Sequence, residues 1–307
     1  MKRILINLIN ENQGAHLIQL KNFLKNLSNF DKKNIFYILS ESDLIVKNNN
    51  FFLIKLNFSK NKYLLIFQRL LFQNFLINFY FWKYRINIYI NFSHSVPFFI
   101  IKNIYKIIAV TNIAPFVKFK DYDFFLKLKL IFLKYKIIFN SKRSNSVISI
   151  SKYCKKILEK NNIKSSKIKV LYNGIDYQKI DNKKNEFKYF LYVSHFYRYK
   201  NFEGLIDGFS NLPKEIKNQY KLLLVGYPYD IKYFNQINFK IKKLNLDKNI
   251  EIHSYLKREE IMSLIKNCDL YIFPSFIENC PMSLLEAIQF DKPILTSNIE
   301  PMNEFCK

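Results

Sequence analysis

Short runs of β-branched and aromatic residues alternate with longer amphipathic runs along the first half of the chain. Ile4–Ile6 predicts a first strand, Gly14-Ala15 a turn, and leucines at helical spacing predict a helix from about His16 to Leu27. The alternation is typical of a parallel sheet flanked by helices. Further strands are predicted near Ile35–Leu39, Ile86–Ile90, Ile107–Val110, Ser146–Ser149 and Ile168–Leu171, with helices at Tyr63–Lys83, Asp123–Phe139 and Lys152–Asn161.

The same pattern restarts after a polar stretch rich in Lys and Asn, Tyr177–Glu186, which we interpret as an interdomain linker. We therefore predict an α/β protein with two doubly wound parallel-sheet domains, residues 1–178 and 179–307, that face each other across a cleft. Residue 307 follows shortly after a strand, and we expect no helix to cover that edge, so the second domain is predicted to be incomplete. The second-half strands are expected at Tyr189–Val193, Leu222–Val225, Ile250–His253 and Leu270–Phe273, and its helices at Phe202–Leu212, Ile231–Leu244 and Arg258–Asn267.

The stretch Ile277–Ser297 carries two carboxylates, Glu278 and Glu286, around a predicted strand-to-helix turn. It follows the apolar strand Leu270–Phe273 and leads into a helix over about Met282–Phe290. In a parallel sheet such a turn lies at the carboxyl end of the strands, where ligands bind. A helix that begins there directs unpaired N–H groups at the ligand, which suits a phosphate, and a nearby carboxylate suits sugar hydroxyls.

The chain is strongly basic: 49 Lys and Arg against 24 Asp and Glu give a net charge of +25. An excess of this size favours a polyanionic partner, such as nucleic acid, an anionic membrane surface or a phosphorylated substrate. A solvated surface rich in lysine explains the charge equally well. Because the sequence has no dense basic arm, zinc-finger spacing or RNA-binding signature, nucleic acid is not the expected partner.

Other features predict a cytoplasmic location. The apolar start is interrupted by Asn7 and Asn10, which favours a first strand over a signal peptide. The most apolar stretch, Leu70–Trp82, contains three amide side chains and is expected to be too short and too polar to span a bilayer. The four cysteines, at no paired or metal-ligand spacing, indicate reduced thiols: Cys154, Cys268, Cys280 and Cys306.

A peripheral position at the inner membrane face is a further expectation. The predicted helices Tyr63–Lys83 and Phe124–Lys136 combine basic and aromatic residues, so they could rest on an anionic membrane surface. The alternative is that their apolar residues simply form core.

Seven segments, taken in order and with their spacing, resemble a known family. The chain is similar over nearly its whole length to family 4 of the retaining glycosyltransferases, which have the GT-B fold of two Rossmann-like domains. The resemblance implies transfer of a sugar from a nucleotide-sugar donor to a glycan or lipid-linked acceptor, with retention at the anomeric carbon. The segments are Gly14-Ala15, Val110–Phe116, Ser146–Leu158, Val170–Asp176, Leu191–Phe209, Leu222–Gly226 and Phe273–Glu304.

The resemblance also implies roles for residues of the second half. Lys200 matches the lysine that contacts the donor diphosphate, and Glu286 the residue that accepts hydrogen bonds from the ribose. Glu278, the predicted catalytic residue, matches the glutamate that lies against the donor sugar. Many members carry an arginine five residues before the lysine; here that position is His195, with Arg198 between, and either is a candidate second cation.

The turn between the two glutamates differs from the commonest family form. Asn279-Cys280-Pro281-Met282-Ser283 replaces a glycine-rich turn and resembles a known variant, so Asn279 and Ser283 are assigned to donor binding. The resemblance predicts no metal and no other cofactor, because GT-B enzymes generally stabilise the leaving diphosphate without one. The single Asp-x-Asp, Asp121–Asp123, is better explained by helix capping.

On the acceptor side, Gly14 and Ala15 would let the backbone approach donor phosphate or acceptor, and an ordinary turn is the alternative. Asn112 and Pro115 match a cleft-lining motif that often has His before the Asn, where this chain has Thr111. His94, at a predicted strand end, is a candidate to lie nearby, with a structural role as its alternative.

Two other functional hypotheses stay open at this stage. A catalytically degenerate or truncated relative is suggested by Thr111, by His195 and by the lack of further predicted helices before residue 307. A polyanion- or nucleic-acid-binding protein is suggested by the net charge.

Overall fold

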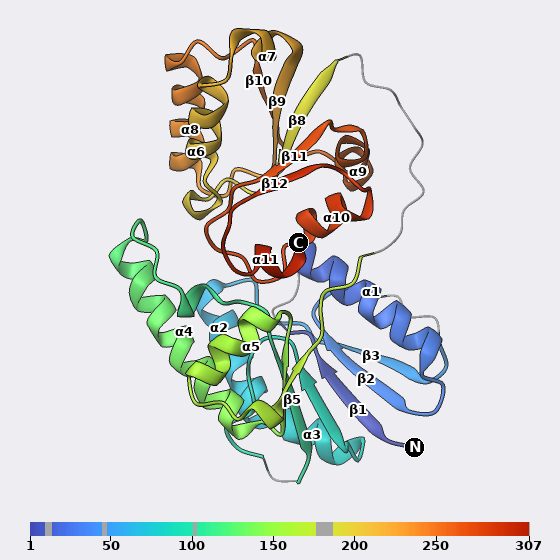
Figure 1. Ribbon diagram of the computed structural model, residues 1–307. Helices are drawn as coiled ribbons and strands as arrows, with labels where there is room; N and C mark the ends of the chain where they lie inside the picture. The colour runs from blue at the N-terminus through green and yellow to red at the C-terminus, as the bar shows by residue number, and fades with distance from the viewer. Residues whose placement is uncertain (10–13, 45–47, 101–102, 176–186, 307) are drawn as a thin grey trace. The chain divides into compact units, whose positions relative to one another are not determined.

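A computed structural model of the chain describes residues 1–9, 14–44, 48–100, 103–175 and 187–306. The chain forms two compact units, each shown in Figure 1. Unit 1 comprises Met1–Phe116 and Phe124–Gly174, and unit 2 comprises Val117–Asp123 and Ile175–Lys307. The predicted linker, Tyr177–Glu186, lies outside the described residues.

Unit 1 is built on a parallel sheet of seven strands, in the order β3-β2-β1-β4-β5-β6-β7. Strand β3 was not predicted, whereas the other six correspond to the predicted runs. The strands are β1 (Arg3–Asn7), β2 (Ile35–Ser40), β3 (Phe51–Lys55), β4 (Ile88–Asn91), β5 (Tyr105–Val110), β6 (Ser146–Ser149) and β7 (Ile168–Val170).

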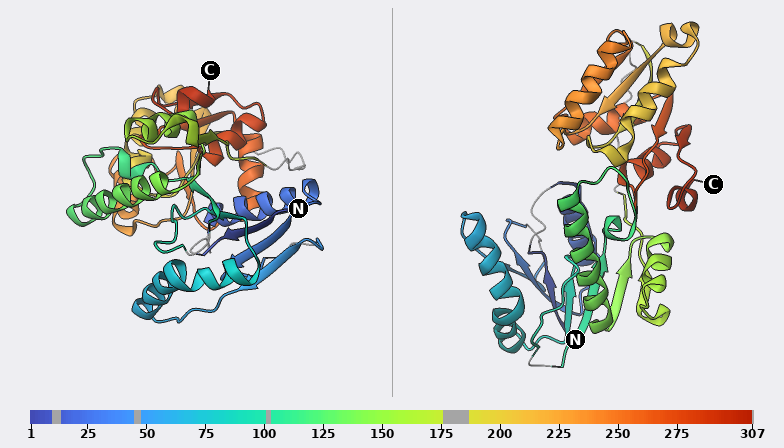
Figure 2. Two further views of the ribbon diagram at one scale, coloured as in Figure 1. Left: turned by 90° about the horizontal axis from the view of Figure 1, so that it is seen from below. Right: turned by 90° about the vertical axis from the view of Figure 1, so that its left-hand side faces the viewer.

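Both faces of this sheet are covered by helices (Figures 1 and 2). Side chains alternate along β1, so Ile4 and Ile6 pack with Leu20 and Leu24 of one helix, while Leu5 packs on the other face. The helices are α1 (Gly14–Phe30), α2 (Lys62–Leu71), a π-helix (Phe72–Leu76), α3 (Ile77–Lys83), α4 (Phe124–Arg143) and α5 (Lys152–Lys160).

The turn predicted at Gly14-Ala15 is wrong, because these two residues form the first two positions of α1. Glycine is a poor residue for a helix interior, but at a helix start it costs little. The helix therefore begins two residues before the predicted boundary at His16.

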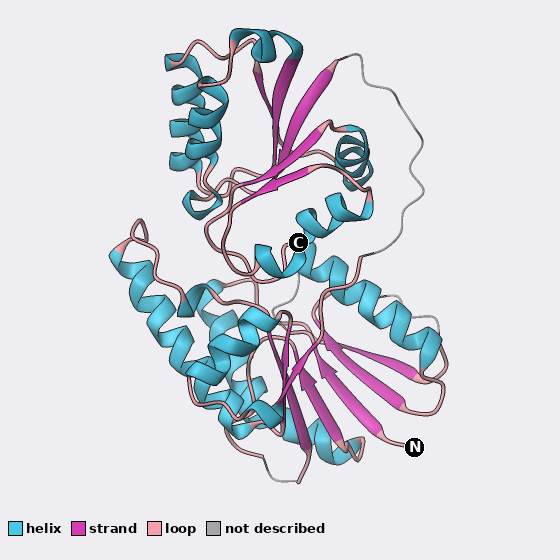
Figure 3. Cartoon of the chain, viewed as in Figure 1, coloured by secondary structure: helices cyan, strands magenta, loops and turns pink. Residues whose placement is uncertain are grey.

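Unit 2 contains a second sheet, whose strands are drawn in magenta in Figure 3. This parallel sheet has five strands in the order β10-β9-β8-β11-β12. Its core is one continuous apolar cluster in which Tyr189, Tyr192 and Tyr271 are fully buried. The strands are β8 (Lys188–Val193), β9 (Tyr220–Val225), β10 (Ile250–His253), β11 (Leu270–Phe273) and β12 (Ile294–Thr296). The helices are α6 (Phe202–Ser210), α7 (Lys214–Gln219), α8 (Ile231–Lys243), α9 (Arg258–Asn267), α10 (Met282–Gln289) and α11 (Met302–Phe305).

The last strand of unit 2, β12, is followed by a helix that was not predicted. A short helix, α11, follows β12 and places Met302 in the core of the unit. Leu295 of β12 nevertheless stays 58% exposed, so one face of this edge strand is only partly covered.

Each sheet has a point where the strand order reverses, and ligands of doubly wound folds bind at such points. In unit 1 the reversal lies between β1 and β4, and in unit 2 between β8 and β11. Because all strands are parallel, the loops after β8 and β11 both lie at the carboxyl ends of the strands of the second sheet.

Substitution of Gly226 tests how tightly the backbone is packed at the carboxyl ends of these strands. A Cβ at this position would lie 1.8 Å from the backbone oxygen of Ser194, in the loop after β8. We expect Gly226→Ala to lower the free energy of unfolding by about 3 kcal/mol, because backbone must move. The matched control is Gly208→Ala in α6, where an added Cβ has nothing within 4 Å; it should raise stability by about 0.5–1 kcal/mol. Equal effects in denaturant unfolding would contradict this description.

Candidate functional site

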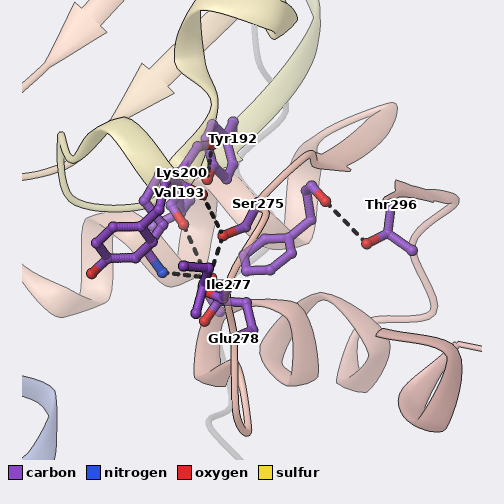
Figure 4. Close-up of polar contacts among 10 residues, drawn as sticks. Tyr192, Val193, Lys200, Ser275, Ile277, Glu278 and Thr296 are labelled. Carbon is purple, nitrogen blue, oxygen red and sulfur yellow. Dashed lines mark hydrogen bonds and ion pairs between the residues drawn. The ribbon is translucent and has the colours of Figure 1, made fainter. Parts of the chain in front are cut away.

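Two of the predicted residues form a direct ion pair at the reversal point of the second sheet. The Nζ atom of Lys200 donates to Oε1 of Glu278 over 2.5 Å (Figure 4). Lys200 follows β8 and Glu278 follows β11, so the pair joins the two loops across the reversal. The side chains are 15% and 10% exposed, which strengthens their attraction and leaves the ammonium with few water contacts.

Backbone contacts fix the two loops in place. The buried Tyr192 hydroxyl donates to the Lys200 carbonyl oxygen over 2.8 Å, and the Phe276 N–H donates to the Tyr199 carbonyl oxygen over 2.8 Å. Asn201 adopts a left-handed conformation, with φ of 59°, and its side-chain oxygen accepts from the N–H of Gly204 at the start of α6. The same side chain donates to the Pro274 carbonyl oxygen over 3.2 Å, which links the loops once more.

Glu286 lies in α10 and is paired with a residue that the sequence analysis did not single out. Its Oε1 accepts from Nη2 of Arg258, the first residue of α9, over 2.6 Å. The glutamate side chain is only 4% exposed. Burial raises the pKa of Glu286, and the Arg258 guanidinium opposes that shift.

The two candidates for a second cation are placed differently. The Arg198 guanidinium donates to Oε1 of Gln236 over 2.6 Å and lies over the Tyr233 ring, so it contacts α8. The His195 Nδ1 accepts from the N–H of Tyr227 over 3.3 Å. His195 is exposed, yet desolvation by its neighbours and then the Lys200 charge lower the pKa of its imidazole from the ordinary 6.5, so the neutral form dominates at pH 7.

The turn between the glutamates begins α10 without a side-chain cap. Ser283 lies in the first turn of that helix, and its hydroxyl donates to the carbonyl oxygen of Val193, the last residue of β8, over 3.0 Å. Asn279 is buried beside Glu278 in the loop. The predicted donor residues Lys200, Glu278, Asn279 and Ser283 are thus gathered where β8 and β11 end.

The acceptor-side residues belong to unit 1. Asn112 follows β5, and its side-chain oxygen accepts from the N–H of Ala114, while Pro115 is buried in the next turn. His94 follows β4 in a left-handed conformation, with Nδ1 2.6 Å from the Ala109 carbonyl oxygen of β5. His94 therefore lies close to the strand that leads to Thr111 and Asn112.

Sequence reasoning missed Arg258 and the segment Val117–Asp123. A basic residue in the first turn of a helix opposes the helix dipole. Lys257 and Arg258 at the start of α9 are unfavourable in this way, which could have indicated a functional role. The segment Val117–Asp123 is grouped with unit 2, where the Phe119 ring packs against Tyr199 and Phe276. No local pattern indicated that contact.

Comparisons with known proteins identify relatives of this chain. Residues 175–307 match the family model "Glycosyl transferases group 1". An uncharacterized glycosyltransferase of Methanocaldococcus jannaschii is 30% identical over 215 residues, 65% of this chain and 52% of the relative. The capsular polysaccharide biosynthesis glycosyltransferase CapH of Staphylococcus aureus is 27% identical over 165 residues, 52% of this chain and 45% of the relative. The aligned regions thus span about half the length of these relatives.

The whole chain also has a known fold. Anabaena Alr3699/HepE, solved in complex with UDP-glucose, superposes with a TM-score of 0.69 at 14% identity, over 100% of this chain and 83% of that one. The two parallel sheets therefore have the GT-B fold, as predicted. Residues 175–307 match the glycosyl transferases group 1 family, which agrees with the family that the sequence resembles.

The buried carboxyl of Glu286 gives a pH-dependent prediction. Because its folded pKa lies above the ordinary value of 4.5, the folded protein binds this proton more tightly than the unfolded chain. Stability from this group is therefore present below pH 4.5 and declines as pH rises through the raised pKa. Melting curves of the wild type and Glu286→Gln between pH 4 and pH 8 should show a stability difference that shifts in favour of the variant as pH rises. A difference independent of pH would contradict the assignment.

Proposed function

We propose that this protein transfers a sugar from a nucleotide-sugar donor to a glycan or lipid-linked acceptor, with retention at the anomeric carbon. The observation that carries the proposal is the Lys200–Glu278 pair, held with little water at the reversal point of the second sheet. Family membership supports glycosyl transfer, and the UDP-glucose in the HepE structure supports a nucleotide-sugar as donor.

The lysine of the pair is proposed to bind the donor diphosphate. A phosphate oxygen that replaces Glu278 as the partner of Nζ would keep the ammonium paired, and hydroxyls of the donor sugar would then supply hydrogen bonds to the released carboxylate. The uncapped N–H groups of α10 lie on the turn after Glu278 and can add to the positive potential. Together these groups would stabilise the leaving diphosphate.

The glutamate released from the lysine is proposed to act on the sugar. The bond between the anomeric carbon and the diphosphate oxygen breaks, and the acceptor hydroxyl oxygen forms the new bond on the same side. The hydroxyl proton leaves with the diphosphate. Glu278 would support the positive character that develops at the anomeric carbon, or orient the sugar hydroxyls.

Glu286 and Arg258 form the second part of the proposed donor site. The guanidinium donates to the buried carboxyl group and opposes the effect of burial on it, and the carboxyl oxygens are proposed to accept hydrogen bonds from ribose hydroxyls. Neutral His195, Asn279 and Ser283 are proposed to line the same site. Arg198 is assigned to donor binding with less support, because its guanidinium contacts Gln236 and Tyr233 of α8.

The acceptor is proposed to bind to unit 1. Asn112 and Pro115 follow β5, and Gly14 and Ala15 begin α1, so all four lie after the carboxyl ends of strands. A glycan or lipid-linked acceptor is supported by the names of relatives, which include a capsular polysaccharide enzyme and an O-antigen chain mannosyltransferase.

Binding of nucleoside diphosphates tests the donor site. We expect Lys200→Met to weaken the binding of the best ligand from a UDP, GDP, ADP and CDP panel about 10- to 100-fold, the loss of a charge-assisted hydrogen bond. Isothermal titration calorimetry measures the change directly.

The matched control is Lys221→Met. Lys221 also pairs with a glutamate over 2.5 Å, but it lies near the start of β9. It is therefore at the amino ends of the strands, whereas Lys200 is at their carboxyl ends. The Lys221→Met variant should bind the nucleoside diphosphate as tightly as the wild type does. Equal losses in both variants, or none in Lys200→Met, would refute the assignment of Lys200 to the diphosphate.

A further inference from the structure

Unit 1 carries a large apolar surface that its own core does not use. Along α2, the π-helix and α3, bulky residues on one side stay exposed, and Trp82 is 76% exposed. Monomeric soluble proteins rarely expose a contiguous apolar patch of this kind without a partner. The exposed residues are Tyr63, Leu64, Ile66, Phe67, Leu70, Leu71, Phe75, Leu76, Phe79 and Trp82 on these helices, and Phe124, Phe125, Leu128, Ile131, Phe132, Tyr135 and Phe139 on α4.

The two helical segments form one surface rather than two. The rings of Phe75 and Phe99 lie 5.1 Å apart, those of Phe99 and Phe98 4.9 Å, and those of Phe98 and Phe139 6.4 Å. Arg143 of α4 also donates to the Phe98 carbonyl oxygen over 2.6 Å. Loop 96–100 therefore bridges the π-helix and α4, and we call the exposed residues of these elements the aromatic face.

The aromatic face lies on a helix that is long enough to cross a membrane. Lys62–Lys83 passes that test by length and composition, whereas the sequence analysis considered only its part Leu70–Trp82. Its other side, however, is anchored in unit 1: Phe72, Ile77 and Phe81 are buried in the core. Arg69 is bound to both carboxylate oxygens of Glu41, so this side belongs to the fold.

Charge indicates what covers the aromatic face. The sequence has no Asp or Glu between Asp43 and Asp121, nor between Asp123 and Glu159. Within α4 the apolar residues alternate with the basic residues Lys127, Lys129, Lys134, Lys136, Lys142 and Arg143. A second copy of the chain would bring two positive surfaces together, whereas an anionic bilayer offers both negative charge and an apolar interior.

A pocket of about 130 Å³ opens in this surface, between the π-helix and α4. Leu70, Phe98 and Phe139 form its apolar lining, and Gln73, Lys136 and Arg143 line it with donors. Among the described residues, the buried Nε2 of Gln73 and Nη1 of Arg143 have no hydrogen-bond partner. Buried donors without a partner are costly, and an anionic group in the pocket would satisfy them. Burial also lowers the pKa of Lys136, as expected for an ammonium without a counter-charge.

We propose that the aromatic face docks on a bilayer containing anionic phospholipids, with one headgroup phosphate in the pocket formed by Gln73, Lys136 and Arg143. The helices then lie in the plane of the interface, with aromatic side chains in the acyl boundary and lysines at the headgroups. Binding needs no sugar donor, so this proposal can fail or succeed independently of the proposed function.

Trp82 is the single tryptophan of the sequence, so its fluorescence reports on the aromatic face alone. The full-length protein is titrated with vesicles of phosphatidylcholine, with and without 30% phosphatidylglycerol. We expect a blue shift of the emission and co-sedimentation only with the anionic vesicles. Duplex DNA, a polyanion without acyl chains among which Trp82 could insert, should leave the emission wavelength unchanged.

Four variants separate the contributions of charge, aromatic side chains and the pocket to vesicle binding. Lys129→Gln with Lys136→Gln should weaken binding to anionic vesicles about fivefold for each lysine removed. Lys242→Gln with Lys243→Gln, the same charge change at exposed positions of α8, is the matched control and should bind as the wild type does. Phe125→Gln with Phe132→Gln should abolish the blue shift, because both rings are exposed and no core contact is lost.

Gln73→Leu tests the pocket itself. Since Nε2 of Gln73 has no partner, the variant should melt no lower than the wild type, yet bind anionic vesicles severalfold more weakly. Binding to neutral vesicles as tight as that to anionic vesicles would overturn the proposal. So would a loss of binding in the Lys242 and Lys243 control as large as that in the Lys129 and Lys136 variant. An emission shift with DNA as large as that with anionic vesicles would also overturn it. A shift that depends only on protein concentration would assign the face to a second copy.

Discussion

The contact between Lys200 and Glu278 is the constraint on which the rest of the second unit depends. A nearly buried ammonium requires a partner, and the fold supplies a carboxylate from a loop 78 residues away. The Asn201 side chain and the Phe276–Tyr199 backbone bond hold those two loops together, and the buried Tyr192 hydroxyl fixes the backbone at Lys200. The two charges satisfy each other, and in the proposed function a diphosphate would replace the carboxylate as the partner of the lysine.

The strands that matter for this site could be predicted from the sequence. Strands buried on both faces appear as unbroken apolar runs, and Leu222–Val225 and Leu270–Phe273 are runs of this kind. Strand β3 was missed because it lies at a sheet edge, where only Phe51 is buried and the signal is weak. The turn at Gly14-Ala15 was wrong because glycine marks both turns and helix starts.

The candidate site was only partly predictable. The spacing of Glu278 and Glu286 on a strand-turn-helix, with a lysine before an earlier helix, is a local pattern and could be recognised. The pairing of Glu286 with Arg258 joins residues 28 apart through the packing of α9 on α10, and no local spacing encodes it. The pKa of His195 is likewise lowered by desolvation and by Lys200, so the direction of this shift follows only from the three-dimensional structure.

The competition for Lys200 can be measured most directly by the affinity of free nucleoside diphosphate for Glu278→Gln. If Glu278 holds the lysine until a diphosphate displaces it, removal of the negative charge should tighten diphosphate binding. The same substitution in a Lys200→Met background should then have little effect, because the shared partner is gone. Unchanged or weaker binding in Glu278→Gln alone would contradict the account.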